Sequence, residues 1–194
     1  MFPRMLGFVF ITLSACAPAA PAPQTPPVPA PFSVPATPTA NPMPANPDPL
    51  LARFADLKPD AAGKVHLTDA QWEKRLTTMQ YQVTRHAATE RAGTGEYEDT
   101  EAAGNYHCIC CGQLLYGAGN KFHSGCGWPA FMDEANPGAI EYRTDNSHGM
   151  ERTEIVCTRC GSHLGHAFYG EGLSKTNVRH CVNSASLLFV PKKN

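Results

Sequence analysis

The order of hydrophobic and polar residues divides the chain of 194 residues into three unlike parts. Residues 1–16 carry one positive charge, Arg4, followed by an apolar run over residues 5–13. That run is too short to span a bilayer and is typical of an export signal. Residues 17–49 are mostly Pro, Ala and Thr, which predicts an extended, semi-rigid tether without a core. Periodic patterns begin only after the tether, so we expect residues 50–194 to form the folded domain.

One segment near the start of this domain has helical periodicity. Thr68 followed by Gln71 has the spacing of a capping box, the pattern that begins many helices. Trp72, Leu76 and Met79 then fall on one face of a helix. The pattern therefore predicts a helix that begins at Thr68 and packs this face on a core.

Beyond residue 106 the apolar runs become short. They lie between Gly, Pro, Asn and Asp, which is typical of antiparallel strands joined by turns. The expected strands cover residues 141–144, 152–157, 164–169 and 181–190. The sequence therefore predicts an α+β domain, mainly β, with small N-terminal helices.

Charge and composition reduce the number of function classes that the chain can belong to. The 16 Lys and Arg residues nearly balance the 17 Asp and Glu residues, which argues against a nucleic-acid partner, because such a protein needs a basic face. The chain is instead marked by eight cysteines and eight histidines. We therefore expect chemistry based on thiols, on metal, or on both.

The export signal ends in Leu13-Ser14-Ala15-Cys16, which resembles a bacterial lipobox, where the signal is cleaved and the cysteine lipidated. This predicts a lipoprotein of the bacterial cell envelope, with Cys16 holding the lipid anchor and the domain facing the periplasm. Ala17, where an inner-membrane retention signal would have Asp, favours the outer membrane. A plain signal peptide or a short membrane anchor is the alternative.

Two segments, Cys108–Gly112 and Cys157–Gly161, share the pattern Cys-x-x-Cys-Gly. In such a zinc knuckle the glycine permits a tight turn, and two knuckles supply four thiolates for one tetrahedral zinc ion. The predicted ligands are Cys108, Cys111, Cys157 and Cys160. Redox dithiols or disulfides are the alternative. Cys110, on the same side of a strand as Cys108, is expected to pack in the core.

Two further cysteines lie outside the knuckles. Cys126 is flanked by glycines, which predicts an exposed, mobile loop. Cys181 follows Arg179 and His180, and nearby positive charge lowers a thiol pKa and favours the nucleophilic thiolate. From its position alone, Cys181 is equally compatible with a core cysteine on a strand.

His163 and His166 follow the second knuckle immediately. If four cysteines saturate the zinc, both histidines remain available for acid–base chemistry. The alternative is that they are additional metal ligands.

Three longer motifs make the chain recognisable: "KFHSGCGWPAF", "SHGMERTEIVCTRCGSHLGHAF" and "RHCVNSASLLF", in this order. Together they resemble the B-type methionine sulfoxide reductases, and the resemblance runs from about residue 67 to 189. It implies a fold of two antiparallel sheets with a few peripheral helices. It also implies reduction of the R epimer of methionine sulfoxide, free or in oxidised proteins, to methionine.

The resemblance also implies roles for individual residues. Cys181 matches the nucleophile, which becomes a sulfenic acid, and Cys126 matches the resolving cysteine, which closes a disulfide recycled by a thioredoxin-like donor. Trp128 matches the aromatic residue that packs against the substrate's methyl group. The matching polar residues are His163, His166, Arg179 and Asn183. The four knuckle cysteines match a structural zinc site found in many members.

One position departs from the family. Many members have an acidic residue where this chain has Gly170, and Glu171 is the candidate substitute. Two other functions remain open from the residues alone. A zinc-ribbon binding module would explain the knuckles without catalysis, and a peroxide reductase or disulfide exchanger would share the reactive cysteine pair.

Overall fold

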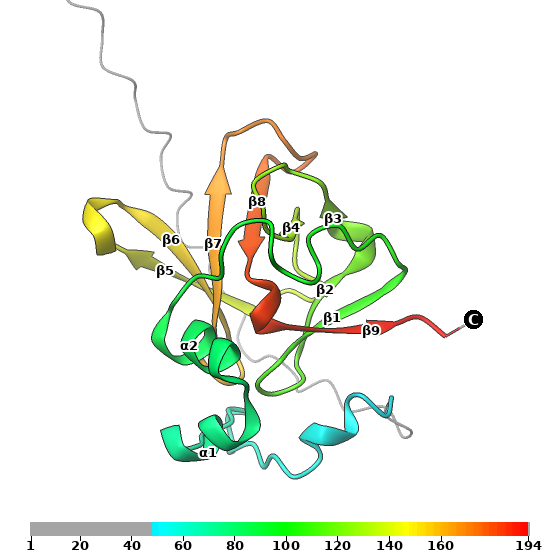
Figure 1. Cartoon of the computed structure of the whole chain (residues 1–194), viewed down its shortest axis with the longest axis vertical. Coiled ribbons are helices and arrows are strands. Elements are labelled where there is room, and N and C mark those ends of the chain that lie inside the picture. Colours follow the sequence, from blue (N-terminus) through cyan, green and yellow to red (C-terminus); the bar gives the residue numbers. More distant parts are fainter. Residues whose placement is uncertain (1–47, 194) are drawn as a thin grey trace, which may run out of the picture. The chain divides into compact units, whose positions relative to one another are not determined.

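The computed structural model describes residues 48–193 (Figure 1). The predicted export signal, the lipobox with Cys16 and all but the last two residues of the predicted tether lie outside the described residues. Within the described part, no helix has both the length and the apolar character needed to cross a membrane.

The helix predicted at Thr68 begins as expected. The Thr68 side chain accepts a hydrogen bond from the Gln71 backbone amide, and the Gln71 side chain accepts one from the Thr68 amide, which completes a capping box. The helix, α1 (Asp69–Arg75), buries Trp72, which is 1% exposed. The predicted start and its buried anchor are therefore confirmed.

The prediction of a single helix continuing to Met79 is wrong. Leu76 has extended backbone angles and ends α1, and Thr77 forms a second capping box with Gln80 that begins α2 (Thr78–His86). The new helix axis places Met79 on the outside, where it is 54% exposed. The capping box at Thr77 starts a new helix, so the apolar spacing of Trp72, Leu76 and Met79 does not describe one continuous helix.

The remainder of the domain is two antiparallel sheets, so the predicted mainly β, α+β fold is confirmed (Figure 1). The smaller sheet has the order β2-β1-β9 and the larger one the order β3-β4-β8-β7-β6-β5. The strands are β1 (Gly104–Cys108), β2 (Leu114–Gly117), β3 (Lys121–Phe122), β4 (Ala130–Phe131), β5 (Ile140–Asp145), β6 (Arg152–Cys157), β7 (His163–Tyr169), β8 (Val178–Val182) and β9 (Leu187–Pro191).

Three of the predicted strands appear as β5, β6 and β7, but the predicted run 181–190 is two strands in different sheets. A short 3-10 helix, η4 (Ser184–Ser186), separates β8 from β9. It turns the chain because the Asn183 carbonyl accepts the Ser186 amide at 3.0 Å. This turn lets one continuous segment join the two sheets directly after Cys181.

A buried aromatic cluster underlies the strands that carry the candidate site. The rings of Tyr116 and Phe131 stack with centroids 4.1 Å apart, and Tyr106 meets Phe131 edge-on at 5.0 Å. All three side chains are fully buried, and aromatic burial of this kind is a large stabilising contribution. Phe131 lies in β4 directly opposite His180 of β8, so the cluster supports the strand that holds Cys181.

Candidate active site and metal centre

The two knuckles are built alike, each at the end of a strand. Cys108 ends β1 and Cys157 ends β6. The Gly112 amide donates to the Cys108 carbonyl at 2.9 Å, and the Gly161 amide donates to the Cys157 carbonyl at 2.8 Å. Both glycines have positive φ, 76° and 67°, which a residue with a side chain rarely adopts. The tight turns predicted from the Cys-x-x-Cys-Gly pattern are therefore present.

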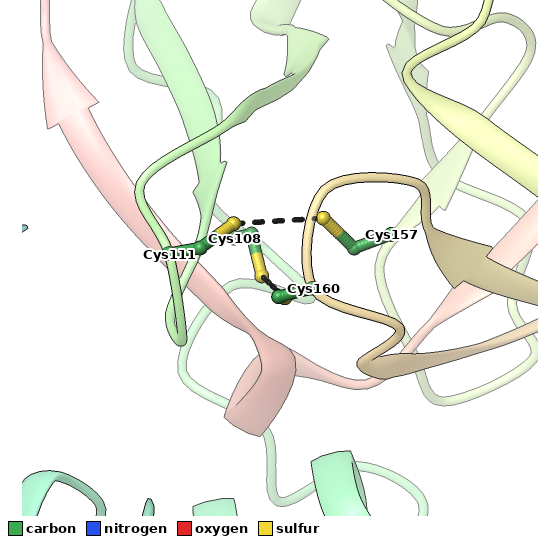
Figure 2. A group of neighbouring side chains, drawn as sticks. All are labelled: Cys108, Cys111, Cys157 and Cys160. Atoms are coloured by element: carbon green, nitrogen blue, oxygen red, sulfur yellow. Dashed lines mark hydrogen bonds between the residues drawn. The ribbon is translucent and has the colours of Figure 1, made fainter. Parts of the chain in front are cut away.

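The knuckles bring their four sulfurs into one cluster (Figure 2). The Sγ atoms of Cys108 and Cys160 are 3.7 Å apart, those of Cys111 and Cys157 are 3.6 Å apart, and all four lie within 4.8 Å of one another. Four sulfurs about 2.3 Å from a tetrahedral zinc ion would be about 3.8 Å apart. The cluster therefore fits one zinc ion.

The chemistry of the cluster also favours a cation. All four cysteines are buried, and burial raises the pKa of the Cys108 and Cys111 thiols well above the ordinary value. Several adjacent thiolates are stable in such a place only beside a positive ion. The four cysteines predicted as zinc ligands are therefore the ones whose thiolates need a bound cation.

Cys110 lies beside the centre but outside the four-cysteine cluster. It is 1% exposed and belongs to the core, as expected. It lies in the knuckle turn rather than on a strand, since β1 ends at Cys108.

A second pair of thiols lies on the larger sheet. Cys181 is in β8, and Cys126 is in the loop before β4, whose Ala130 is directly opposite Cys181. The two Sγ atoms are 3.6 Å apart, in hydrogen-bonding contact, and both cysteines are half-buried. The structure thus brings together the two cysteines that the family resemblance pairs.

The expectation of an exposed Cys126 is wrong, because the residue is half-buried. The Gly127 carbonyl accepts the Gly93 amide at 2.8 Å, and a Cβ on Gly127 would lie 2.7 Å from that of Ala92. Gly125 and Gly127 have φ of 72° and 91°, a conformation that favours glycine, and they shape the turn that carries Cys126. Because the sulfurs are already adjacent, no large swing is needed before a disulfide forms.

The two thiols of this pair differ in pKa. The hydrogen bond between the sulfurs lowers the pKa of Cys126 to about 5 and raises that of Cys181. The Ser124 hydroxyl also donates to Cys126 Sγ at 2.9 Å and further stabilises its thiolate. Arg179 lowers the pKa of Cys181 as expected, but the hydrogen bond to Cys126 and burial have the larger effect and raise it in the reduced pair.

His180 does not supply the positive charge expected of it. Successive side chains of a strand point to opposite faces, so His180 points away from Cys181. It is buried between the hydroxyls of Tyr116 and Tyr142, each 3.2 Å from a ring nitrogen. Burial lowers the pKa of His180 to about 4, so the ring is neutral near pH 7.

Arg179 is the cation beside the thiol pair, and its charge lowers the pKa of both Cys126 and Cys181. Its guanidinium lies over the Phe168 ring, 4.3 Å from the centroid, and donates twice to Glu171, at 2.7 and 2.8 Å. A two-point pair of this kind fixes the guanidinium plane. The carboxylate that binds Arg179 is thus that of Glu171, one position after Gly170.

Each of the two histidines is paired with a carboxylate. His163 Nδ1 lies 2.7 Å from Glu154 Oε1, and His166 Nε2 lies 2.8 Å from Asp145 Oδ2. Neither histidine belongs to the metal cluster. The rings are 5.5 Å apart, and His166 is directly opposite Cys181, so the two side chains share one face of the sheet.

Burial affects the two histidines differently. Burial lowers the pKa of His166, and the hydrogen bond to Asp145 partly opposes this effect. The Nε2 atom of buried His163 has no hydrogen-bond partner among the described residues. Two oriented imidazoles beside a thiol pair can donate or accept protons at a bound group.

Trp128 and Asn183 complete the set. The Trp128 indole N–H donates to the Glu90 carbonyl at 3.1 Å. The buried Asn183 side chain donates to the Leu164 carbonyl at 3.1 Å and accepts the Glu90 amide at 3.0 Å. Both predicted residues are thus held by a backbone segment far away in sequence.

Four residues of the site were not found from the sequence. They are Glu90, Ser124, Asp145 and Glu154. Only Ser124 had a local signal, its place two residues before Cys126. The partners of the histidines and of Trp128 are brought in by tertiary contacts over distances of up to 38 residues, which no spacing rule reveals.

Comparison with known proteins agrees with this geometry. Residues 76–191 match the family model described as the SelR domain. A relative from Burkholderia thailandensis, named peptide methionine sulfoxide reductase MsrB, is 52% identical over 124 residues, which are 64% of this chain and 87% of the relative. A relative of the same name from Burkholderia cenocepacia is 54% identical over 121 residues, 62% of this chain and 85% of the relative. The chain therefore belongs to the SelR-domain family of B-type methionine sulfoxide reductases.

Proposed function

We propose that the protein reduces the R epimer of methionine sulfoxide in oxidised proteins to methionine, with Cys181 as nucleophile and Cys126 as resolving cysteine. The observation that carries this assignment is the 3.6 Å contact between the two sulfurs in a site that also holds two carboxylate-paired histidines. Cys181 is assigned the attack because it is the sulfur directly opposite His166.

The first step transfers oxygen. As Cys181 attacks the sulfoxide sulfur, its proton passes to the Cys126 thiolate 3.6 Å away. Cys126 is suited to accept it because its thiolate is already stabilised by Ser124 and Arg179. The attack forms a bond between the Cys181 sulfur and the substrate sulfur. The protonated oxygen then leaves the substrate sulfur with the electrons of the S–O bond and bonds to the Cys181 sulfur. The sulfur–sulfur bond breaks with its electron pair on methionine, which leaves, and Cys181 remains as a sulfenic acid.

The oxygen must accept a proton during this step, because an unprotonated oxygen makes the sulfur a poor electrophile. His163 and His166 provide this proton, and the hydrogen bonds to Glu154 and Asp145 fix the planes of the two rings. Trp128 gives the methyl group an apolar surface. Methyl and oxygen are thereby directed to opposite walls, which selects one epimer.

The second step restores the enzyme. The Cys126 thiol attacks the Cys181 sulfenic acid, water leaves, and a disulfide forms. An external dithiol of the thioredoxin class then supplies two electrons and two protons and becomes a disulfide itself. The zinc centre takes no part in these steps and stabilises the fold that carries them.

An epimer-resolved assay tests the assignment. Reduced protein is incubated with a peptide containing methionine R-sulfoxide, with the S-sulfoxide peptide, and with hydrogen peroxide. We expect consumption of the R epimer alone, and none by Cys181→Ser. Equal rates with both epimers would contradict the proposed pocket, and peroxide turnover without sulfoxide turnover would favour a peroxide reductase.

We further propose that the protein is a lipoprotein of the bacterial cell envelope, anchored through Cys16 and facing the periplasm, in the outer membrane. The support is the apolar run over residues 5–13, the Leu13-Ser14-Ala15-Cys16 sequence and the Pro-rich segment 17–49. Cys16→Ala should remove the lipid and release the protein from the membrane fraction or leave it unprocessed. Unchanged lipidation and membrane association would contradict the proposal.

A further inference from the structure

Glu90 is a buried carboxylate that the proposed reaction does not use. It is 6% exposed and lies after α2, in the segment that packs against the site. We propose that Glu90 is a positioning residue that holds Trp128 and the chain beyond Cys181 in one fixed relation. This inference rests on the proposed function only where it assigns substrate contact to Trp128.

The carboxylate of Glu90 holds the segment that follows the nucleophile. Its two oxygens accept the backbone amides of Ser184 at 2.6 Å and Ala185 at 2.9 Å, at the start of η4. These are the amides that a helix start leaves without partners. Asn183, the residue before η4, makes no side-chain cap, because its side chain is bound to Leu164 and Glu90. Glu90 therefore supplies the cap from a distant part of the chain.

The backbone of Glu90 reaches the opposite side of the same site. Its amide donates to Asn183 Oδ1 at 3.0 Å, and its carbonyl accepts the Trp128 indole N–H at 3.1 Å. Glu90 thus contacts the chain two, three and four positions after Cys181, and also Trp128. A displacement of Glu90 would move both.

Close packing leaves little freedom for Glu90 to shift. A Cβ on Gly95 would lie 2.6 Å from Glu90 Oε1 and would also clash with Ser184 Oγ. The Tyr97 amide donates to Ser184 Oγ at 3.1 Å and fixes the hydroxyl from the same segment. The absence of a side chain at Gly95 is therefore what allows the carboxylate to reach both amides.

Glu90→Gln tests the proposal, with Glu96→Gln as the matched control on an exposed position of the same segment. A glutamine can accept one of the two amides but directs N–H at the other. We expect the KM for an R-sulfoxide peptide to rise about tenfold, because the Trp128 wall is displaced, with a smaller change in kcat. The alkylation rate of the Cys126–Cys181 pair should not change, and the control should behave as the wild type.

A second measurement follows the indole directly and needs no turnover. The chain has two tryptophans, so the Trp128 indole N–H can be assigned in a ¹⁵N spectrum by its loss in Trp128→Phe. In the wild type it should be protected from solvent exchange, and Glu90→Gln or Gly95→Ala should lower that protection at least tenfold. Glu96→Gln should leave it unchanged.

The outcomes decide between the two proposals. Free exchange of the indole N–H in the wild type, or an unchanged KM and unchanged protection in Glu90→Gln, would overturn the role of Glu90. If Glu90→Gln does not fold, the wild-type exchange rate and Gly95→Ala give the same decision. Normal protection together with absent R-sulfoxide turnover in the wild type would instead refute the proposed function and leave the positioning role intact.

Discussion

The zinc centre and the Cys126–Cys181 pair place sulfur atoms at the same separation. Neighbouring sulfurs are 3.6 and 3.7 Å apart in the first and 3.6 Å apart in the second. The surroundings differ. All four knuckle cysteines are buried, whereas Cys126 and Cys181 are half-buried beside Arg179 and Ser124.

This difference separates binding from reactivity. In the centre, burial raises the pKa of Cys108 and Cys111, so thiolates there depend on a metal cation. In the pair, a hydrogen-bonded network and a fixed guanidinium stabilise one negative charge without metal. The separation of two thiols therefore says little about their role, and exposure and nearby fixed charge decide it.

The largest effect should come from removing a zinc ligand. Structural zinc sites in small domains contribute about 10–16 kcal/mol of apparent binding free energy, comparable to the whole stability of a domain. We expect Cys157→Ser to lose its zinc and to unfold or nearly so, as followed by metal content and thermal melting. Cys110→Ser is the matched control and should keep the metal at a cost of about 1–3 kcal/mol. Equal stability of Cys157→Ser and the wild type would show that the four-cysteine centre does not stabilise the fold.

The next effect is confined to recycling. Cys126→Ser should release about one equivalent of methionine per enzyme and then stop under thioredoxin, because the Cys181 sulfenic acid has no partner. Dithiothreitol should partly restore turnover by reducing that acid directly. Mass spectrometry of the wild type after one turnover should show a Cys126–Cys181 bridge. A Cys110–Cys181 bridge, or unimpaired thioredoxin-driven turnover, would mean that another cysteine resolves the intermediate.

The pH dependence of alkylation should distinguish the Cys126–Cys181 pair from ordinary cysteines. Since the pKa of Cys126 is lowered to about 5, its thiolate persists above that pH and is lost below it. Alkylation of the reduced pair should therefore have a midpoint near pH 5, against about 8.5 for an ordinary cysteine. Cys181→Ser should raise the midpoint, since the thiol of Cys181 is the largest cause of the shift. A midpoint near 8.5 in the wild type would contradict the proposed lowering of the Cys126 pKa by its hydrogen bond with Cys181.

The smallest effect concerns Glu171, the carboxylate that binds Arg179 one position after Gly170. The partly exposed Glu171–Arg179 pair is worth about 1 kcal/mol, so Glu171→Gln should lower kcat/KM roughly fivefold. The reason is that Arg179 loses its two-point partner and its fixed position near the thiols. Moving the acid back, in a Gly170→Asp, Glu171→Gly variant, should restore part of the loss. No change in either variant would mean that Phe168 packing alone orients Arg179.

The elements that could be predicted from sequence were those with local causes. Thr68 and Gln71 are three residues apart, and Cys108 and Cys111 are separated by one tight turn, so spacing alone predicted the first cap and the knuckles. The run over residues 181–190 was misjudged because a continuous apolar pattern does not show where a chain leaves one sheet for another. Leu76 was misjudged because the second cap at Thr77 competes with the helical period.

By itself, the sequence determined the secondary-structure class, the metal ligands and the family, because each depends on residues close together in the chain or on long ordered motifs. Only the tertiary structure decided how the site works. It turned His180 away from Cys181 and buried it as a neutral ring, brought Cys126 into hydrogen-bonding contact with Cys181, and joined Glu90 to Trp128 and Ser184. The physical reason is that pKa values and side-chain orientations depend on burial and on partners across the sheets, which the linear order of residues does not contain.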